Sequence, residues 1–136
     1  MRKGFTLVEI MVVVAIIAVL VSLAIPNVLR ARMTANESAA KANIQSIATA
    51  YETYANSNNG SYPVSQAALL PASLGGSANP PYLHAAYDGQ TISGYIYSLT
   101  FNSTSTYTIT ATPSSCGTTG SITYSITNSV LSQSSC

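Results

Sequence analysis

The residues whose types and spacing suggest chemistry lie near the N-terminus, between Gly4 and Glu9. Two basic residues precede Gly4, so a short basic leader ends at a glycine. Glu9 is a single carboxylate inside an apolar run that continues to Ile25. Placing a charged carboxylate in hydrocarbon costs about 2.5–3.5 kcal/mol even on lenient insertion scales, so an acid at this position indicates a function.

The element that must position Glu9 is this apolar segment, from Phe5 to Ile25. Only Thr6, Glu9 and Ser22 interrupt it. As a helix it would be about 31 Å long, which is enough to cross the hydrocarbon core of a membrane. A secretory signal has a shorter apolar region, followed by its cleavage site. Here the small residue, Gly4, precedes the apolar segment, so we expect that segment to remain in the mature protein. Its side chains are apolar on every face, which indicates burial all round.

The leader ending in Gly4, the Phe-Thr-Leu-x-Glu pattern that begins at Phe5, and the long apolar helix together resemble the type IV prepilin family. The resemblance implies that a prepilin peptidase cuts after Gly4 and methylates the new amine of Phe5. It implies that Glu9 sets the stagger between subunits by pairing with the Phe5 amine of a neighbour. It also implies that Pro26 marks a helix kink. The resemblance covers about residues 1–65, and beyond them only the architecture matches.

The rest of the sequence predicts an α+β fold, in which a long N-terminal helix packs on a small antiparallel β-sheet head, as in the pilin fold. After Pro26 the pattern becomes amphipathic, with Ile44, Ile47 and Tyr51 on one stripe. Alternating apolar and polar residues near 95–101, 107–111 and 122–126 predict three strands. The expected segments are a leader (1–4), a membrane-spanning and filament-core helix (5–25), an amphipathic second half of the helix (26–57), a connecting loop region (58–93) and the sheet head with a C-terminal disulfide loop (94–136).

Charge is sparse, because charged residues make up 7% of the 136 residues, against about 25% in ordinary soluble domains. No Lys or Arg follows Lys41, whereas a nucleic-acid surface needs clustered cations, so we expect no nucleic acid as the main partner. The one histidine, His84, has no cysteine nearby, and Asp88 is the single carboxylate after Glu52. We therefore expect no metal site, no cofactor and no enzymatic activity.

The two cysteines, Cys116 and Cys136, lie twenty residues apart near the C-terminus. From the residues alone, two free thiols in a reducing compartment and a disulfide in an exported domain are both open. The resemblance implies an exported head, and it therefore implies a disulfide that closes a C-terminal loop. Such a loop would stabilise the fold by about 3 kcal/mol in the chain-entropy model.

These features predict a structural subunit, a major pilin, of an extracellular type IV pilus. Its partners would be further copies of itself in a homopolymer, the prepilin peptidase and the pilus assembly machinery. The precursor would lie in the inner membrane, and the mature chain in a filament on the cell surface. Whether such a filament serves adhesion, motility or DNA uptake stays open.

Three alternatives remain. A type II secretion pseudopilin would share the fold, but the family resemblance implies a calcium site there, and the head lacks the carboxylates for one. A minor pilin is also open. A membrane-anchored binding module that never polymerises would have no need for the carboxylate of Glu9.

Overall fold

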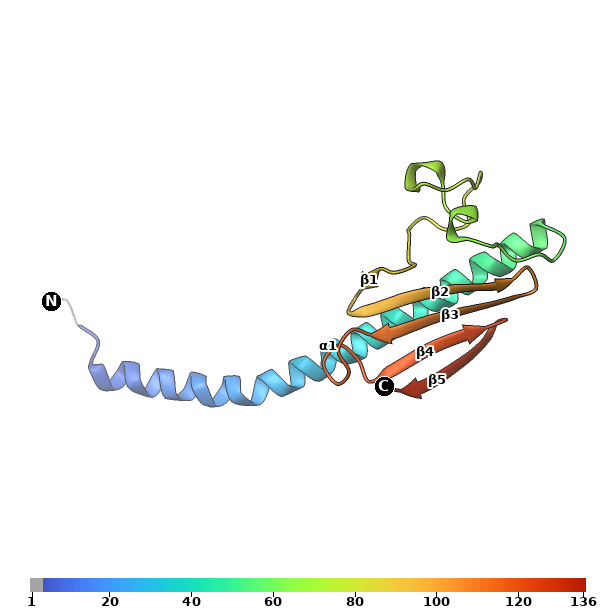
Figure 1. Cartoon of the computed structure of the whole chain (residues 1–136). Coiled ribbons are helices and arrows are strands. Elements are labelled where there is room, and N and C mark those ends of the chain that lie inside the picture. The colour runs from blue at the N-terminus through green and yellow to red at the C-terminus, as the bar shows by residue number, and fades with distance from the viewer. Residues whose placement is uncertain (1–3) are drawn as a thin grey trace. The chain divides into compact units, whose positions relative to one another are not determined.

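The computed structural model describes residues 4–136, so the predicted leader residues Met1 to Lys3 lie outside the described range. The chain forms one long N-terminal helix followed by a five-stranded antiparallel sheet (Figure 1). This arrangement confirms the predicted α+β fold class. The chain divides into two units: the N-terminal unit, Met1–Arg32, and the head, Met33–Cys136.

Helix α1 (Leu7–Ser57) begins and ends at residues whose chemistry favours those positions. It starts directly after Thr6, whose Oγ1 accepts a hydrogen bond from the backbone N–H of Glu9 at 3.2 Å. A threonine in this role satisfies one of the free N–H groups of the first turn. The helix ends where Asn59 and Gly60 adopt positive φ angles of 54° and 80°. Glycine takes this left-handed conformation readily, and the N–H of Gly60 bonds to the carbonyl of Ala55 at 2.8 Å.

The segment between α1 and the sheet contains two short 3-10 helices, Gln66–Ala68 and Ala72–Leu74. The side chain of Gln66 holds the end of this segment in place, because its Oε1 accepts hydrogen bonds from the backbone N–H groups of Tyr87 and Asp88 at 2.7 and 2.8 Å. Its apolar anchors are buried in the core of the head; they are Leu69, Leu70 and Leu83.

The sheet is a simple meander in which each strand pairs antiparallel with the next. Its strands are β1 (Thr91–Ile92), β2 (Tyr95–Ser103), β3 (Thr106–Pro113), β4 (Ile122–Thr127) and β5 (Val130–Ser135). The β4–β5 turn consists of Asn128 and Ser129, which both have positive φ angles, of 46° and 68°. Two such residues match the right-handed twist of the flanking strands.

The prediction of three strands was incomplete, since the sheet also contains β1 and β5. β1 has only two residues, which is too short for an alternating pattern. β5 reads Val-Leu-Ser-Gln-Ser-Ser, and only Leu131 in it is even half-buried. A strand that buries so little apolar surface leaves almost no hydrophobic alternation in the sequence.

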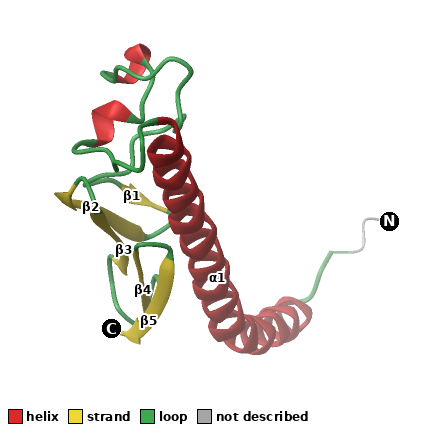
Figure 2. Cartoon of the chain, turned by 90° about the vertical axis from the view of Figure 1, so that its right-hand side faces the viewer, coloured by secondary structure: helices red, strands yellow, loops and turns green. Residues whose placement is uncertain are grey.

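The core of the head lies between one face of the sheet and residues 40–55 of α1 (Figure 2). The predicted stripe of Ile44, Ile47 and Tyr51 is fully buried there. The sheet contributes the alternate residues of its three long strands, as the alternation predicted: Tyr95, Tyr97, Leu99, Tyr107, Ile109, Ala111, Tyr124 and Ile126. All residues of this core belong to the head, so the head has a hydrophobic core of its own.

Candidate functional site

The predicted cleavage site lies in an exposed, irregular segment. Gly4, Phe5 and Thr6 precede α1 and have no regular secondary structure. The Phe5 side chain is 80% exposed, and no atom lies within 4 Å of the place that a Cβ on Gly4 would take. Exposed, irregular segments are preferred sites of proteolysis, and the Gly4–Phe5 bond lies in such a segment.

Glu9 occupies the third helical position after Thr6, in the first turn of α1. The residues Thr6 to Glu9 match the capping-box pattern, Ser or Thr followed three positions later by Glu or Gln. A carboxylate in the first turn also interacts favourably with the positive end of the helix dipole. Glu9 can therefore help to start the helix in addition to any role in assembly. This second role was not predicted from the sequence, although the Thr-x-x-Glu spacing indicates it.

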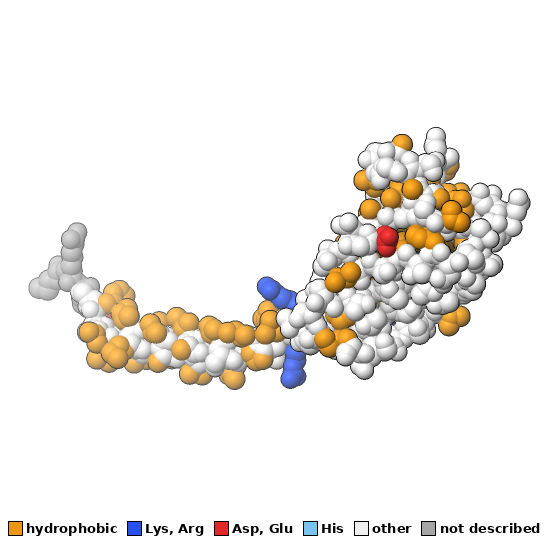
Figure 3. Space-filling model, in the orientation of Figure 1, with side chains coloured by type: hydrophobic (Ala, Val, Ile, Leu, Met, Phe, Trp, Pro, Cys, Tyr) orange, Lys and Arg blue, Asp and Glu red, His pale blue; other side chains and the backbone are white. Residues whose placement is uncertain are grey.

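The described apolar residues of the N-terminal unit are not buried by other residues of that unit. All residues from Gly4 to Arg32 are exposed, and hydrophobic side chains are spread along the visible surface of this part of the chain, with basic side chains at the end nearest the head (Figure 3). Among the described residues, α1 is the one helix long and apolar enough to cross a membrane, with a mean hydropathy of 3.0 over its most apolar window. Exposed apolar surface on this scale marks contact with a membrane or with another protein.

Pro26 lies inside α1, which continues on both sides of it. Because proline has no backbone N–H, the carbonyl of Ser22 loses its usual helical partner. Two side chains nearby donate to other backbone carbonyls of the helix: Ser22 Oγ donates to Val19 at 2.7 Å, and Asn27 Nδ2 donates to Leu23 at 3.3 Å.

Cys116 and Cys136 form a disulfide in the head. The loop that begins at Cys116 is also fastened to α1. Asn36 Nδ2 donates to the carbonyl of Thr119 at 3.0 Å, and Glu37 Oε1 accepts from both the N–H and the hydroxyl of Ser121 at 2.8 Å. The disulfide and these hydrogen bonds hold the C-terminal end of the sheet against the helix.

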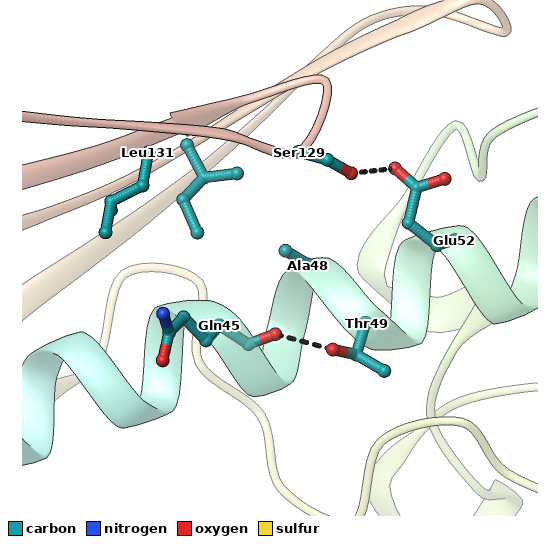
Figure 4. Close-up of a pocket in the computed structure, with 7 residues that line it drawn as sticks. Gln45, Ala48, Thr49, Glu52, Ser129 and Leu131 are labelled. Atoms are coloured by element: carbon teal, nitrogen blue, oxygen red, sulfur yellow. Dashed lines mark hydrogen bonds between the residues drawn. The ribbon is translucent and has the colours of Figure 1, made fainter.

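A second cluster, the Glu52 clamp, lies at the opposite end of the β4–β5 hairpin; we define it as Glu52, Tyr62, Tyr107 and Ser129. Glu52 Oε1 accepts hydrogen bonds from the hydroxyls of Ser129 at 2.6 Å, Tyr107 at 2.9 Å and Tyr62 at 3.1 Å. The Ser129 bond is drawn in Figure 4, beside a groove of about 390 Å³ between α1 and the hairpin. This cluster was not predicted from the sequence, because its members are far apart in the chain.

The electrostatics of the clamp favour a charged carboxylate beside neutral phenols. Desolvation raises the pKa of Glu52, but the hydrogen bonds from Ser129, Tyr107 and Tyr62 together outweigh it and hold that pKa below its usual value. Burial raises the pKa of Tyr107 to about 12, and the neighbouring carboxylate of Glu52 adds to the rise. The clamp therefore stays in one protonation state over the whole physiological range.

Residues 1–25 match the family model described as the prokaryotic N-terminal methylation motif. The chain carries that motif. The match includes Gly4, Phe5 and Glu9, together with the apolar segment that follows them.

The chain is similar to type IV pilins and to a secretion-system protein. It is 45% identical over 78 residues to the type IV wide pilus major component PilA4 of Thermus thermophilus, covering 57% of each chain. It is 42% identical over 53 residues to the type IV major pilin protein PilA of Myxococcus xanthus, covering 39% of this chain and 24% of that one. It is 41% identical over 68 residues to the type II secretion system core protein G of Pseudomonas aeruginosa, covering 50% and 47%.

The chain thus spans less than two thirds of the length of each of these relatives. No solved structure matches the chain significantly. The three relatives are named as components of type IV pili or of a type II secretion system, and the chain is similar to these proteins over part of its length.

Proposed function

We propose that the chain is a structural subunit, the major pilin, of an extracellular type IV pilus. The observation that carries this proposal is an apolar segment, residues 5–25, that is exposed all round and contains Glu9. Burying a Val, Leu or Ile side chain stabilises by about 1.5–3 kcal/mol, so packing these segments together would drive assembly strongly. The similarity to the two type IV pilins also supports a pilin subunit.

Processing would precede assembly. A prepilin peptidase would cut after Gly4, remove the leader (1–4) and methylate the amine of Phe5. The exposed, irregular backbone around this bond supports the proposal. The precursor would lie in the inner membrane through residues 5–25, with the head on the far side, where oxidising conditions keep the disulfide formed.

Glu9 would then set the register between neighbouring subunits. In the filament core, the Phe5 ammonium of one subunit would neutralise the Glu9 carboxylate of another. A buried ion pair is weak evidence for stability, but a wrong stagger would leave a charge unpaired. Pro26 would provide a helix kink between the filament core (5–25) and the second half of the helix (26–57), while the loop region (58–93) and the sheet with its disulfide (94–136) would form the filament surface. Copies of the chain and the pilus assembly machinery would be its partners.

A second candidate is the pseudopilin of a type II secretion system, and the similarity to core protein G favours it. A pseudopilin would use the same N-terminal processing and helix packing. The two candidates differ in where the assembly ends, because a pilus extends from the cell and a pseudopilus does not.

The test is electron microscopy of material sheared from cells, with mass spectrometry of the subunit in any filament. A subunit that begins at a methylated Phe5 is the result expected of a pilin. Chain that is cut but found only in the inner membrane would overturn the pilus in favour of the pseudopilin. Uncut chain would contradict both.

The role of Glu9 has a sharper test in Glu9→Gln. Glutamine keeps the capping-box pattern with Thr6, so the helix start is preserved while the charge is lost. The variant should be cut and inserted in the membrane but should form no filaments. Glu37→Gln is the matched control, since it removes a carboxylate from the head, and it should form filaments normally. Filaments of ordinary number and length from Glu9→Gln would contradict the register role.

A further inference from the structure

Within residues 4–136, strand β5 has an outer edge that no other strand pairs with. In a two-residue hairpin, the residues next to the turn form a hydrogen-bonded pair, and bonded pairs then alternate with non-bonded ones. Thr127 pairs with Val130 at the β4–β5 turn, so the residues of β5 alternate from there. Val130, Ser132 and Ser134 therefore direct their backbone groups toward β4. The backbone N–H and C=O groups of Leu131, Gln133 and Ser135 point away from the sheet, and β5 is its last strand.

The opposite edge of the sheet, on β2, is covered as far as Leu99. β1 covers the start of β2, and beyond it the backbone of Tyr97 bonds to Gly89 and Gln90, at 2.9 and 3.0 Å. The next outward N–H, of Leu99, donates to the side chain of Asp88 at 2.9 Å. The fold thus covers most of one edge of the sheet, whereas no backbone hydrogen bond within the described residues covers the other.

β5 also has none of the features that block edge pairing. Proteins protect an open edge with charges, prolines or bulges, and the sequence Val-Leu-Ser-Gln-Ser-Ser contains no charge and no proline. The pairing of β4 with β5 is regular over six residues, without a bulge. The disulfide at Cys136, and a hydrogen bond from its N–H to the carbonyl of Ser121 at 3.1 Å, hold the end of β5 in place. The edge is therefore already ordered for a partner strand.

We propose that β5 pairs antiparallel with β5 of a second copy of this chain, centred on Gln133. In this register Gln133 lies opposite Gln133 of the second copy, and Leu131 lies opposite Ser135. It is the register in which all three outward-facing residues find partners, with about six backbone hydrogen bonds. On the other face of the strand, Ser132 lies opposite Ser134. Every cross-strand pair is uncharged, so no like charges oppose one another.

We infer that the partner strand belongs to a second copy of the chain, because the outward-facing residues of β5 can all pair with those of an identical strand. The two strands meet by a twofold rotation, so the contact joins heads in pairs and cannot extend by itself into a filament. A six-residue edge buries less than the roughly 1,200–2,000 Å² of a stable interface, so a single contact is weak. It becomes significant where many heads are displayed together. If the proposed pilus is correct, the contact would join neighbouring filaments side by side.

The first test is site-directed crosslinking of the full-length chain in neutral detergent micelles. Under mild oxidation, Gln133→Cys should form disulfide-linked dimers at least tenfold faster than Thr112→Cys. Thr112 is exposed on β3, inside the sheet, and provides the matched control, because association through the apolar segments affects both variants equally. Equal rates would overturn the proposal. Faster crosslinking through Ser132→Cys than through Gln133→Cys would overturn the register.

The second test uses a separate pair of cysteine variants, so that the misfolding of one variant in the first test does not decide the result. A Leu131→Cys chain and a Ser135→Cys chain report the contact by crosslinking to each other. Placing Gln133→Lys in both chains should reduce this crosslinking at least threefold at low salt, because the two lysines lie directly opposite. Gln133→Lys in one chain and Gln133→Glu in the other should restore it. Failure of the oppositely charged combination to restore crosslinking would overturn the proposal. Neither test requires filaments, so a failure of the proposed function would be seen separately.

Discussion

The Glu52 clamp predicts a large and pH-dependent contribution of one carboxylate to the stability of the head. Glu52→Gln keeps the size of the side chain but removes the charge that Ser129, Tyr107 and Tyr62 bond to. A hydrogen bond to a charged group contributes about 1.5–3 kcal/mol, against about 0.5–1.5 kcal/mol for a neutral one. Three weakened bonds at a half-exposed site should therefore cost about 2 kcal/mol, which lowers the melting temperature of a head of this size by about 8–16 °C.

The sign of the pH dependence follows from the direction of the pKa shift. Although desolvation raises the pKa of Glu52, the hydrogen bonds from Ser129, Tyr107 and Tyr62 outweigh it, so the pKa of Glu52 is lower in the folded protein than its ordinary value of 4.5. Its contribution is therefore complete above that value and is lost as the pH falls through the lower, folded pKa. The difference in stability between the wild type and Glu52→Gln should be full at pH 7 and should shrink at pH values below about 4.

The assay is urea unfolding of the full-length chain in detergent, followed by the near-ultraviolet circular dichroism of the tyrosines. Gln45→Ala, on the same groove but outside the clamp, is the matched control and should change stability little. A double-mutant cycle with Ser129→Ala should show strong coupling to Glu52→Gln. Equal unfolding midpoints for wild type and Glu52→Gln at pH 7, or an unchanged difference at pH 3, would refute the reasoning.

Three further predictions concern the head. Replacing Cys116 by Ser should lower the free energy of unfolding by about 3 kcal/mol, measured by urea unfolding, and free thiols found by mass analysis in the native wild type would contradict it. Gly120→Ala should cost about 1–3 kcal/mol in the same assay, because its Cβ would overlap the hydroxyl of Tyr95, which donates to the carbonyl of Ile122 at 2.8 Å. Burial raises the pKa of Tyr95 and of Tyr107 to about 12. The neutral phenols therefore stabilise the fold fully below about pH 10, and this contribution should fall as the pH rises from 10 to 12, which unfolding midpoints across that range would reveal.

The parts of the fold that bury apolar surface could be predicted from the sequence, because buried apolar residues recur with the period of a helix or of a strand. The stripe of Ile44, Ile47 and Tyr51 has the helical spacing, and the strands around Tyr97 and Ile109 alternate. β5 leaves no such pattern, since its partner β4 holds it by backbone hydrogen bonds that any residue can make. Edge strands of this kind cannot be found by hydrophobicity alone.

The candidate functional residues also fall into those that the sequence predicts and those that it does not. The N-terminal motif is local, so its residues could be found by spacing, and so could the cap formed by Thr6. The Glu52 clamp joins residues up to 77 positions apart, and it exists only after the hairpin has folded back onto α1. The contact between Gly120 and Tyr95 depends on backbone positions from two strand ends. No composition or period in the sequence contains that information.

The two units of the chain differ in whether their apolar surface is exposed or buried. The side chains of the N-terminal unit are exposed throughout its described residues, so they keep their apolar surface available for lipid or for other chains. The head must therefore be stable without their help. It has its own core of tyrosines and aliphatic residues, a disulfide at one end of the β4–β5 hairpin and the Glu52 clamp at the other. In the proposed function, the apolar segment would move from a membrane into an assembly while the head stays folded, because none of the contacts that hold the head together would have to break.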